Sequence, residues 1–161
     1  MHEFRNFVTQ DWPVNNSHLA RVTLAVFRLG QLANKHHHGQ RVCKALDFLW
    51  SRLLMGADLP PDVQAGPRLS LPHGGRGVVL HPLTRIGADV TIYHRVTLGR
   101  LDPMDAAPEI GDLVYIGTGA VILGGVVVGD RARVGANAVV LVDVPAGGIA
   151  VGVPALVKNA E

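Results

Sequence analysis

The chain has 161 residues, of which 48% are hydrophobic and 17% charged, and it carries a formal net charge of +2 and one cysteine. This length and composition predict one packed domain with a small appendage, and they exclude a disordered chain and an intrachain disulfide. The sequence has no Lys/Arg run typical of nucleic-acid binding, and no stretch reaches the ~20 apolar residues of a membrane span. We therefore expect a reduced, cytoplasmic protein.

The first 56 residues are expected to form an N-terminal arm and a two-helix appendage. Residues 1–16 contain the turn signals Trp12-Pro13 and Asn15-Asn16 and are predicted to be irregular. Ser17 is a suitable cap for a helix of about 17–34. The predicted apolar face of this helix comprises Val22, Ala25, Val26, Leu29, Leu32 and Ala33.

A second helix is predicted over about 40–55, between the histidine run 36–38 and Gly56. One face of this helix carries Val42, Leu46, Leu49, Trp50, Leu53 and Leu54. The three adjacent histidines suit a metal by composition alone. Because adjacent residues cannot all face one ion, the expectation is a solvated loop between the helices.

From Ile86 onward every sixth residue is aliphatic, apart from one interruption between Gly99 and Glu109. These positions are Ile86, Ile92, Leu98, Ile110, Ile116, Ile122, Val128, Val134 and Val140. The position four residues further along is small or aliphatic, as in Val90, Val96, Val114, Ala120, Val126, Ala132, Ala138 and Val144. A six-residue period fits neither an amphipathic helix nor an alternating strand. It predicts that residues 57–161 form an all-β solenoid of roughly four to five coils, with one short strand and one turn in each hexapeptide.

Three segments resemble the left-handed parallel β-helix acyltransferases. They are the hexapeptide run, the stretch 89–99 (Asp-Val-Thr-Ile-Tyr-His-Arg-Val-Thr-Leu-Gly) and Val151-Gly152-Val153-Pro154. Over about residues 56–158 the chain is most similar to serine acetyltransferases and to the short polysaccharide O-acetyltransferases. The resemblance implies a left-handed parallel β-helix, acetyl-CoA as acyl donor, no metal, and a homotrimer with the CoA groove between adjacent subunits.

A catalytic pair is also implied by the resemblance. Leu71-Pro72-His73-Gly74 is similar to the family's Leu-Asp-His-(Gly/Ala) segment, and Asp58 precedes His73 by the family's fifteen residues. His73 would be the base that deprotonates an acceptor hydroxyl as it attacks a thioester carbonyl, and Asp58 would orient the imidazole. Since three hexapeptides make one coil, Asp58 is expected nearly one coil below His73, within hydrogen-bonding range.

The donor site follows from the same resemblance. In the family the residue after a repeat glycine in two successive coils contacts the pantetheine arm, and here these residues are Thr118 and Ala136. Gly99 lies on the approach to the same groove. The family usually has an arginine near the CoA phosphates at the position of Leu156, so another cation is expected to replace it. The candidates are Lys158, Arg131 and Arg133.

The acceptor site departs from the serine acetyltransferase pattern. Pro72 replaces an aspartate, and Ala106-Ala107-Pro108 replaces an Arg-His-Pro segment that contacts serine in the family. These losses and the small appendage favour a sugar or glycan hydroxyl as acceptor, with serine as the alternative. His94, Arg100 and Asp102 are the expected acceptor contacts.

Two other functions are compatible with the repeat. A γ-class carbonic anhydrase-like protein would hold Zn²⁺ with three histidines across a subunit boundary, for which His73, His81 and His94 are the candidates. Their spacing and surroundings argue against this reading. The other alternative is a non-catalytic solenoid that has lost its acceptor site, which the substitutions at Pro72, Ala106 and Ala107 keep open.

Overall fold

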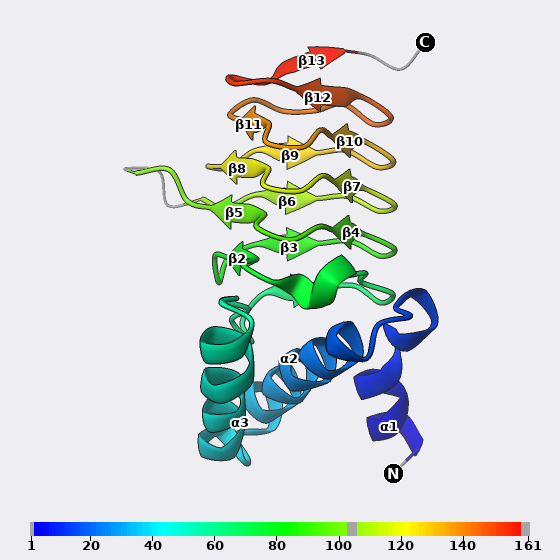
Figure 1. Cartoon of the computed structure of the whole chain (residues 1–161), viewed down its shortest axis with the longest axis vertical. Coiled ribbons are helices and arrows are strands. Elements are labelled where there is room, and N and C mark those ends of the chain that lie inside the picture. The colour runs from blue at the N-terminus through cyan, green and yellow to red at the C-terminus, as the bar shows by residue number, and fades with distance from the viewer. Residues whose placement is uncertain (1, 103–105, 159–161) are drawn as a thin grey trace.

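The computed structural model describes residues 2–102 and 106–158, which form a helical base and a stack of coils above it (Figure 1). The base contains α1 (His2–Thr9), a 3-10 turn (Trp12–Val14), α2 (His18–His36), α3 (Gln40–Asp47) and a π-helical turn (Phe48–Leu54) that continues α3. The two ends of the described chain lie at opposite ends of the long axis (Figure 1). None of the described helices is both long and apolar enough to cross a membrane.

The coils build three sheets of very short strands. Sheet 1 contains β1 (Gln64–Ala65), β3 (Arg85–Ile86), β6 (Glu109–Ile110) and β9 (Val127–Val128). Sheet 2 contains β4 (Thr91–Ile92), β7 (Tyr115–Ile116), β10 (Arg133–Val134), β12 (Ile149–Val151) and β13 (Leu156–Lys158). Sheet 3 contains β2 (Val79–Leu80), β5 (Thr97–Gly99), β8 (Val121–Leu123) and β11 (Val139–Val140). All pairs are parallel except β12–β13, which is antiparallel.

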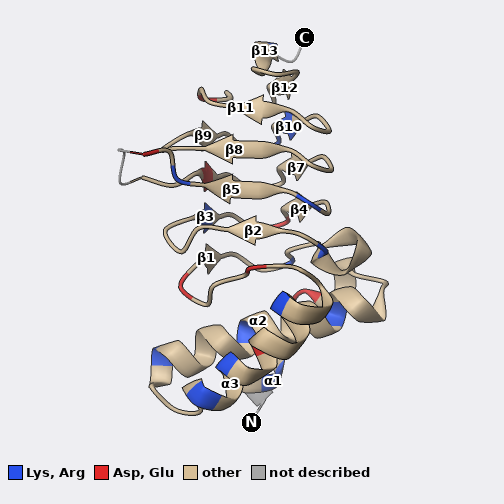
Figure 2. Cartoon of the chain, turned by 60° about the vertical axis from the view of Figure 1, so that its left-hand side comes forward, with Lys and Arg blue, Asp and Glu red and all other residues tan. Residues whose placement is uncertain are grey.

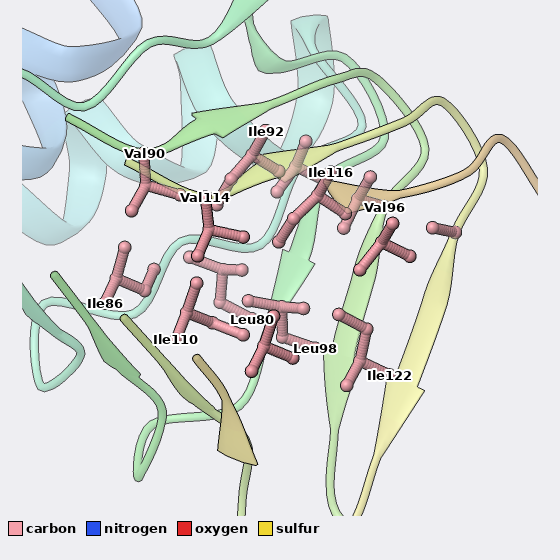
Figure 3. Packing of buried hydrophobic residues seen from close by; sticks show 14 of the residues in the cluster. Leu80, Ile86, Val90, Ile92, Val96, Leu98, Ile110, Val114, Ile116 and Ile122 are labelled. Atoms are coloured by element: carbon pink, nitrogen blue, oxygen red, sulfur yellow. The ribbon is translucent and has the colours of Figure 1, made fainter. Parts of the chain in front are cut away.

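This arrangement is typical of a left-handed β-helix with a helical N-terminal region, so the predicted fold class is confirmed. Figure 2 shows Lys and Arg concentrated on the helices, while the strands above carry few charges. The two aliphatic columns of the repeat point into the space between the three sheets (Figure 3). Every residue of both columns is buried, for example Ile92 and Val96 at 0% exposure. Burial of such side chains, at about 1.5–3 kcal/mol each, explains why the repeat alone specifies the coil.

Two insertions interrupt the regular coil. Val121 pairs with Val139, eighteen residues later, whereas Ser70 pairs with Thr91, twenty-one residues later. The three additional residues lie at the first corner between sheets 2 and 3, where a 3-10 turn spans Pro72–Gly75. The second insertion separates Thr97 from its partner Val121 by twenty-four residues and corresponds to the predicted loop.

The helical base differs from its prediction in three respects. The arm 1–16 is largely helical rather than irregular. The buried face of α2 contains Ala20, Thr23, Leu24, Phe27, Arg28 and Ala33, so most of its predicted apolar face is wrong. The apolar residues of α3 and the π-helical turn, Val42, Leu46, Leu49, Leu53 and Leu54, are exposed, and only Trp50 packs against the core.

A buried polar network explains why α2 turns Arg28 inward. The Arg28 guanidinium is fully buried and forms an ion pair with Asp11, 2.8 Å from Nε to Oδ2. It also donates to the carbonyls of Ala65 and Gly66, at 2.8 and 2.6 Å. Asp11 accepts from the backbone N–H of Leu69 at 2.9 Å. The network thereby satisfies backbone groups of the first coil that have no coil below them.

Candidate active site

His73 projects from the three-residue insertion at the first corner between sheets 2 and 3. It has φ 61°, and Gly74 and Gly75 follow with φ 77° and 71°, so three successive residues occupy the left-handed region. Helix α2 supports the turn, because the Thr23 hydroxyl donates to the Gly74 carbonyl at 2.9 Å. A Cβ on Gly74 would lie 3.0 Å from the Leu19 Cβ, so only glycine fits against α2 here. The turn leaves the His73 side chain exposed.

The imidazole of His73 lies beside that of His94 from the next coil. The two rings meet edge to face with centroids 4.9 Å apart, and Tyr93 lies 6.3 Å from His73. Both histidines line a hollow of about 710 Å³. Its remaining lining residues are Arg76, Arg95, Leu19, Met55 and Gly77. Two adjacent nitrogen bases in an open hollow suit proton transfer to or from a small molecule.

Thr118 fixes the orientation of His94. Its hydroxyl lies 2.9 Å from His94 Nε2 and 3.1 Å from the His94 carbonyl oxygen. Both contacts are satisfied when Nε2–H donates to the hydroxyl and the hydroxyl donates to the carbonyl. That tautomer leaves Nδ1 as a bare lone pair, and Nδ1 is buried without a hydrogen-bond partner among the described residues.

Asp58 pairs with Arg52 in this structure. It lies next to Val79 at the start of sheet 3, and its carboxylate is 2.8 Å from Arg52 Nη2 of the π-helical turn. Within the described residues it makes no hydrogen bond to His73, so the Asp58–His73 pairing stays a prediction. The physical reason for the missing hydrogen bond is the inserted turn at His73 together with capture of the carboxylate by Arg52.

The predicted donor residues share one corner. His94, Thr118 and Ala136 follow one another in successive coils between sheets 2 and 3, and the Asn137 N–H donates to the Thr118 carbonyl at 2.8 Å. Gly99 ends β5 on sheet 3, where it lines a second hollow with Asp58. Lys158 ends β13 at the last coil, next to Ile149. The structure therefore brings Thr118 and Ala136 to the His73 corner, and leaves Gly99 and Lys158 outside that hollow.

The predicted acceptor residues are divided. His94 lies in the hollow with His73, whereas Arg100 and Asp102 pair with each other at 2.7 Å at the start of the loop. Residues 103–105 of this loop, on which part of the acceptor prediction falls, lie outside the described residues. Sequence reasoning missed Arg76 and Arg95. The available signal was their position, three residues after His73 and directly after His94.

Tyr115 marks the outer face of sheet 2 near this corner. Its ring lies 5.3 Å from Tyr93, and the Arg133 guanidinium lies 4.5 Å above it. Burial, followed by the hydrogen bond with Tyr93, raises the pKa of the Tyr115 hydroxyl above its usual value. Arg133, one of the candidate phosphate-binding cations, is thus stacked on an aromatic ring.

The three histidines considered for zinc do not gather. His81 lines the hollow of Asp58 and Gly99, where its Nδ1 accepts from the Leu83 N–H at 3.3 Å. In the part of the chain that the structure describes, no three His, Cys, Asp or Glu side chains are grouped as metal ligands.

The chain is similar in sequence and in structure to known hexapeptide-repeat transferases. A family model described as bacterial transferase hexapeptide (six repeats) matches residues 107–141. The chain is 42% identical over 134 residues to a serine acetyltransferase of Helicobacter pylori strain J99, covering 82% of this chain and 77% of that relative. Soybean serine acetyltransferase complexed with serine superposes with a TM-score of 0.85 at 29% identity, over 98% of this chain and 70% of that one. A serine acetyltransferase in complex with CoA gives a TM-score of 0.78 at 29% identity, over 88% and 57% of the two chains.

Proposed function

The chain belongs to the serine acetyltransferase family of hexapeptide-repeat transferases, and from this premise we propose that it acetylates the hydroxyl of L-serine with acetyl-CoA. Membership makes it an acetyl-CoA-dependent O-acetyltransferase. The comparisons give no support to the expected sugar or glycan acceptor, and they favour serine, the alternative. The similarity to a structure complexed with serine supports the acceptor, and the similarity to one with CoA supports the donor.

The observation that carries the proposal is the position of His73. Its imidazole stands exposed on a turn that α2 holds in place, beside His94 and on the same corner as Thr118 and Ala136. The neutral imidazole takes the serine hydroxyl proton while that oxygen bonds to the thioester carbonyl carbon. When the C–S bond breaks, the imidazolium returns the proton to the departing thiolate, so acetylserine and CoA leave with the base restored.

Asp58 is proposed to stabilise the His73 imidazolium only after it exchanges its present partner. The Arg52 and Asp58 side chains are 52% and 40% exposed. An ion pair of this exposed kind contributes at most about 1 kcal/mol, so the carboxylate can leave Arg52 at little cost. We expect Asp58→Asn to lower kcat by at least about tenfold. Arg52→Gln frees the Asp58 carboxylate and also removes the Arg52 contact with Asp47, 3.2 Å from Nε to Oδ2. This variant is expected to leave kcat unchanged or raise it; a fall in both variants would contradict this exchange.

His73→Ala tests the proposed reaction. Release of CoA from acetyl-CoA is followed with L-serine and, separately, with simple sugars and nucleotide sugars as acceptors. The wild type is expected to turn over L-serine, and His73→Ala to lose about 10²–10⁴-fold in kcat, the usual contribution of a general base. His81→Ala is the matched control, since it removes an imidazole from a neighbouring hollow. Turnover of a sugar in place of serine would overturn the proposed acceptor.

A further inference from the structure

The hollow at His73 has a strongly biased charge. Four of its seven lining residues are basic, namely His73, Arg76, His94 and Arg95, and no carboxylate lines it. The chain as a whole has a formal net charge of only +2. The guanidinium groups of Arg76 and Arg95 are therefore a local concentration of positive charge beside the proposed base, and they favour an anionic group in the hollow.

Arg76 and Arg95 are held together by their backbones. They lie at the same corner in successive coils, and the Arg95 N–H donates to the Arg76 carbonyl at 2.8 Å. Gly77 follows Arg76 in the sequence, and a Cβ added to it would come 3.2 Å from the Arg95 Cγ. The bare glycine thus leaves room for the Arg95 stem to lie along the lower coil.

The guanidinium groups of Arg76 and Arg95 have no side-chain or backbone partner among the described residues. Each arginine is exposed, and among the described residues neither side chain forms an ion pair or hydrogen bond. Two other arginines of the solenoid have carboxylate partners, Arg68 with Asp89 and Arg85 with Glu109, and Arg133 stacks on Tyr115. Unpaired guanidinium groups offer several donors that match a carboxylate, so this pair beside the base is suited to an external anion.

We propose that Arg76 and Arg95 are specificity-determining residues that bind the carboxylate of the acceptor while His73 acts on its hydroxyl. The inference rests on the acetyl transfer proposed above and names the acceptor class, a hydroxyl compound with a carboxylate a few bonds away. The phosphates of CoA are the other anions in the reaction. They are separated from the thioester by the whole pantetheine arm, whereas these arginines share the hollow of the base.

L-serine and L-serinamide provide the test, because they share the hydroxyl and the amine and differ in the carboxylate. The wild type is expected to prefer serine by about ten- to hundredfold in kcat/KM, the range for charge-assisted hydrogen bonds. The double variant R76Q/R95Q is expected to lose most of that preference through a higher KM for serine. Its KM for acetyl-CoA and its kcat/KM for serinamide should stay within about twofold of wild type.

The control is R5Q/R41Q, which removes the same charge from exposed positions on α1 and α3. An equal loss of preference in the control, or an unchanged preference in R76Q/R95Q, would overturn the assignment. A raised KM for acetyl-CoA alone would also overturn it and assign the arginines to the donor.

Calorimetric titration of both compounds into the CoA complex separates this inference from the proposed function. Binding of serine to wild type but not to R76Q/R95Q, without turnover, would support the arginines and contradict the reaction. Turnover of serine by both proteins with equal KM would contradict the arginines and support the reaction. If the wild type neither binds nor acetylates serine, both are overturned.

Discussion

At the scale of single residues, Thr118 stands where the family contacts pantetheine and also holds the ring of His94. The Thr118 hydroxyl donates its single proton to the His94 carbonyl, so it can only accept from His94 Nε2–H. The tautomer of His94 therefore depends on this side chain. The His94 ring lies against the His73 ring. A substitution of Thr118, more than 20 residues further along the chain, is therefore expected to affect both histidines. The expected donor contact and the orientation of the ring beside the proposed base therefore depend on the same threonine.

Thr118→Val removes the hydroxyl and keeps the shape of the side chain. We expect kcat with serine to fall by about two- to tenfold, the range for loss of one neutral hydrogen bond. Nitrogen NMR of His94 is expected to show a mixture of tautomers in place of one. Thr97→Val, on the neighbouring sheet, is the control. An unchanged His94 spectrum in Thr118→Val would contradict the orientation described here.

At the scale of structural elements, the corners between sheets 1 and 2 depend on a column of glycines, Gly66, Gly87, Gly111 and Gly129. A Cβ on Gly111 would lie 2.8 Å from the backbone nitrogen of Asp130 in the next coil. The coils also hold each other here by side chains, since Asp130 accepts from the Asp112 N–H at 2.8 Å. The backbones of successive coils thus approach closely at this corner, which leaves no space for a Cβ and lets the Asp130 carboxylate reach the Asp112 N–H.

Gly111→Ala is therefore expected to lower the free energy of unfolding by about 1–3 kcal/mol, as overpacking does. The measurement is urea denaturation followed by circular dichroism, with Glu109→Gln as control because that side chain is exposed and only weakly paired. Equal midpoints for the two variants would show that the coils move apart without cost.

The junction between helices and solenoid depends on Arg28. Arg28→Met leaves the Asp11 carboxylate buried and without its cation, so we expect a loss of about 3–5 kcal/mol in the free energy of unfolding. The double variant Asp11→Asn/Arg28→Met should be less destabilised than the sum of the single variants, because no unpaired charge remains. Additive losses in this cycle would contradict a direct ion pair.

At the scale of the whole molecule, the outer surface exposes many large hydrophobic side chains. Exposed hydrophobic side chains occur on the solenoid strands and in the helical base. They include Val79, Val127, Ile149 and Val151 on the strands and Val42, Phe48, Leu49, Leu53 and Leu54 in the base. Surfaces of this kind are typical of subunit contacts.

A homotrimer, implied by the resemblance, is the expected assembly. Sedimentation equilibrium should give about 51 kDa, three times the 17.1 kDa chain. Val127→Asp on sheet 1 is expected to weaken the association if that face is buried between subunits. Leu53→Asp in the base tests whether the helices form the subunit contact instead. A mass of one chain across the micromolar range would contradict the trimer.

The six-residue period determined the coil, its core and the family resemblance, because each repeat uses the same local rule and buries the same two columns. The sequence named His73, His94, Thr118 and Ala136, and the tertiary structure alone decided which other side chains surround His73. A three-residue insertion lifts His73 out of the coil, Arg52 takes Asp58, and Arg76 and Arg95 meet beside the base. It also turned Arg28 of α2 inward, against the apolar pattern, to satisfy backbone groups of the first coil. Arg28 meets Ala65 and Gly66 from far away in the sequence, whereas the inserted turn and the Arg52–Asp58 pair are local exceptions to the repeat; the six-residue period encodes neither kind of contact.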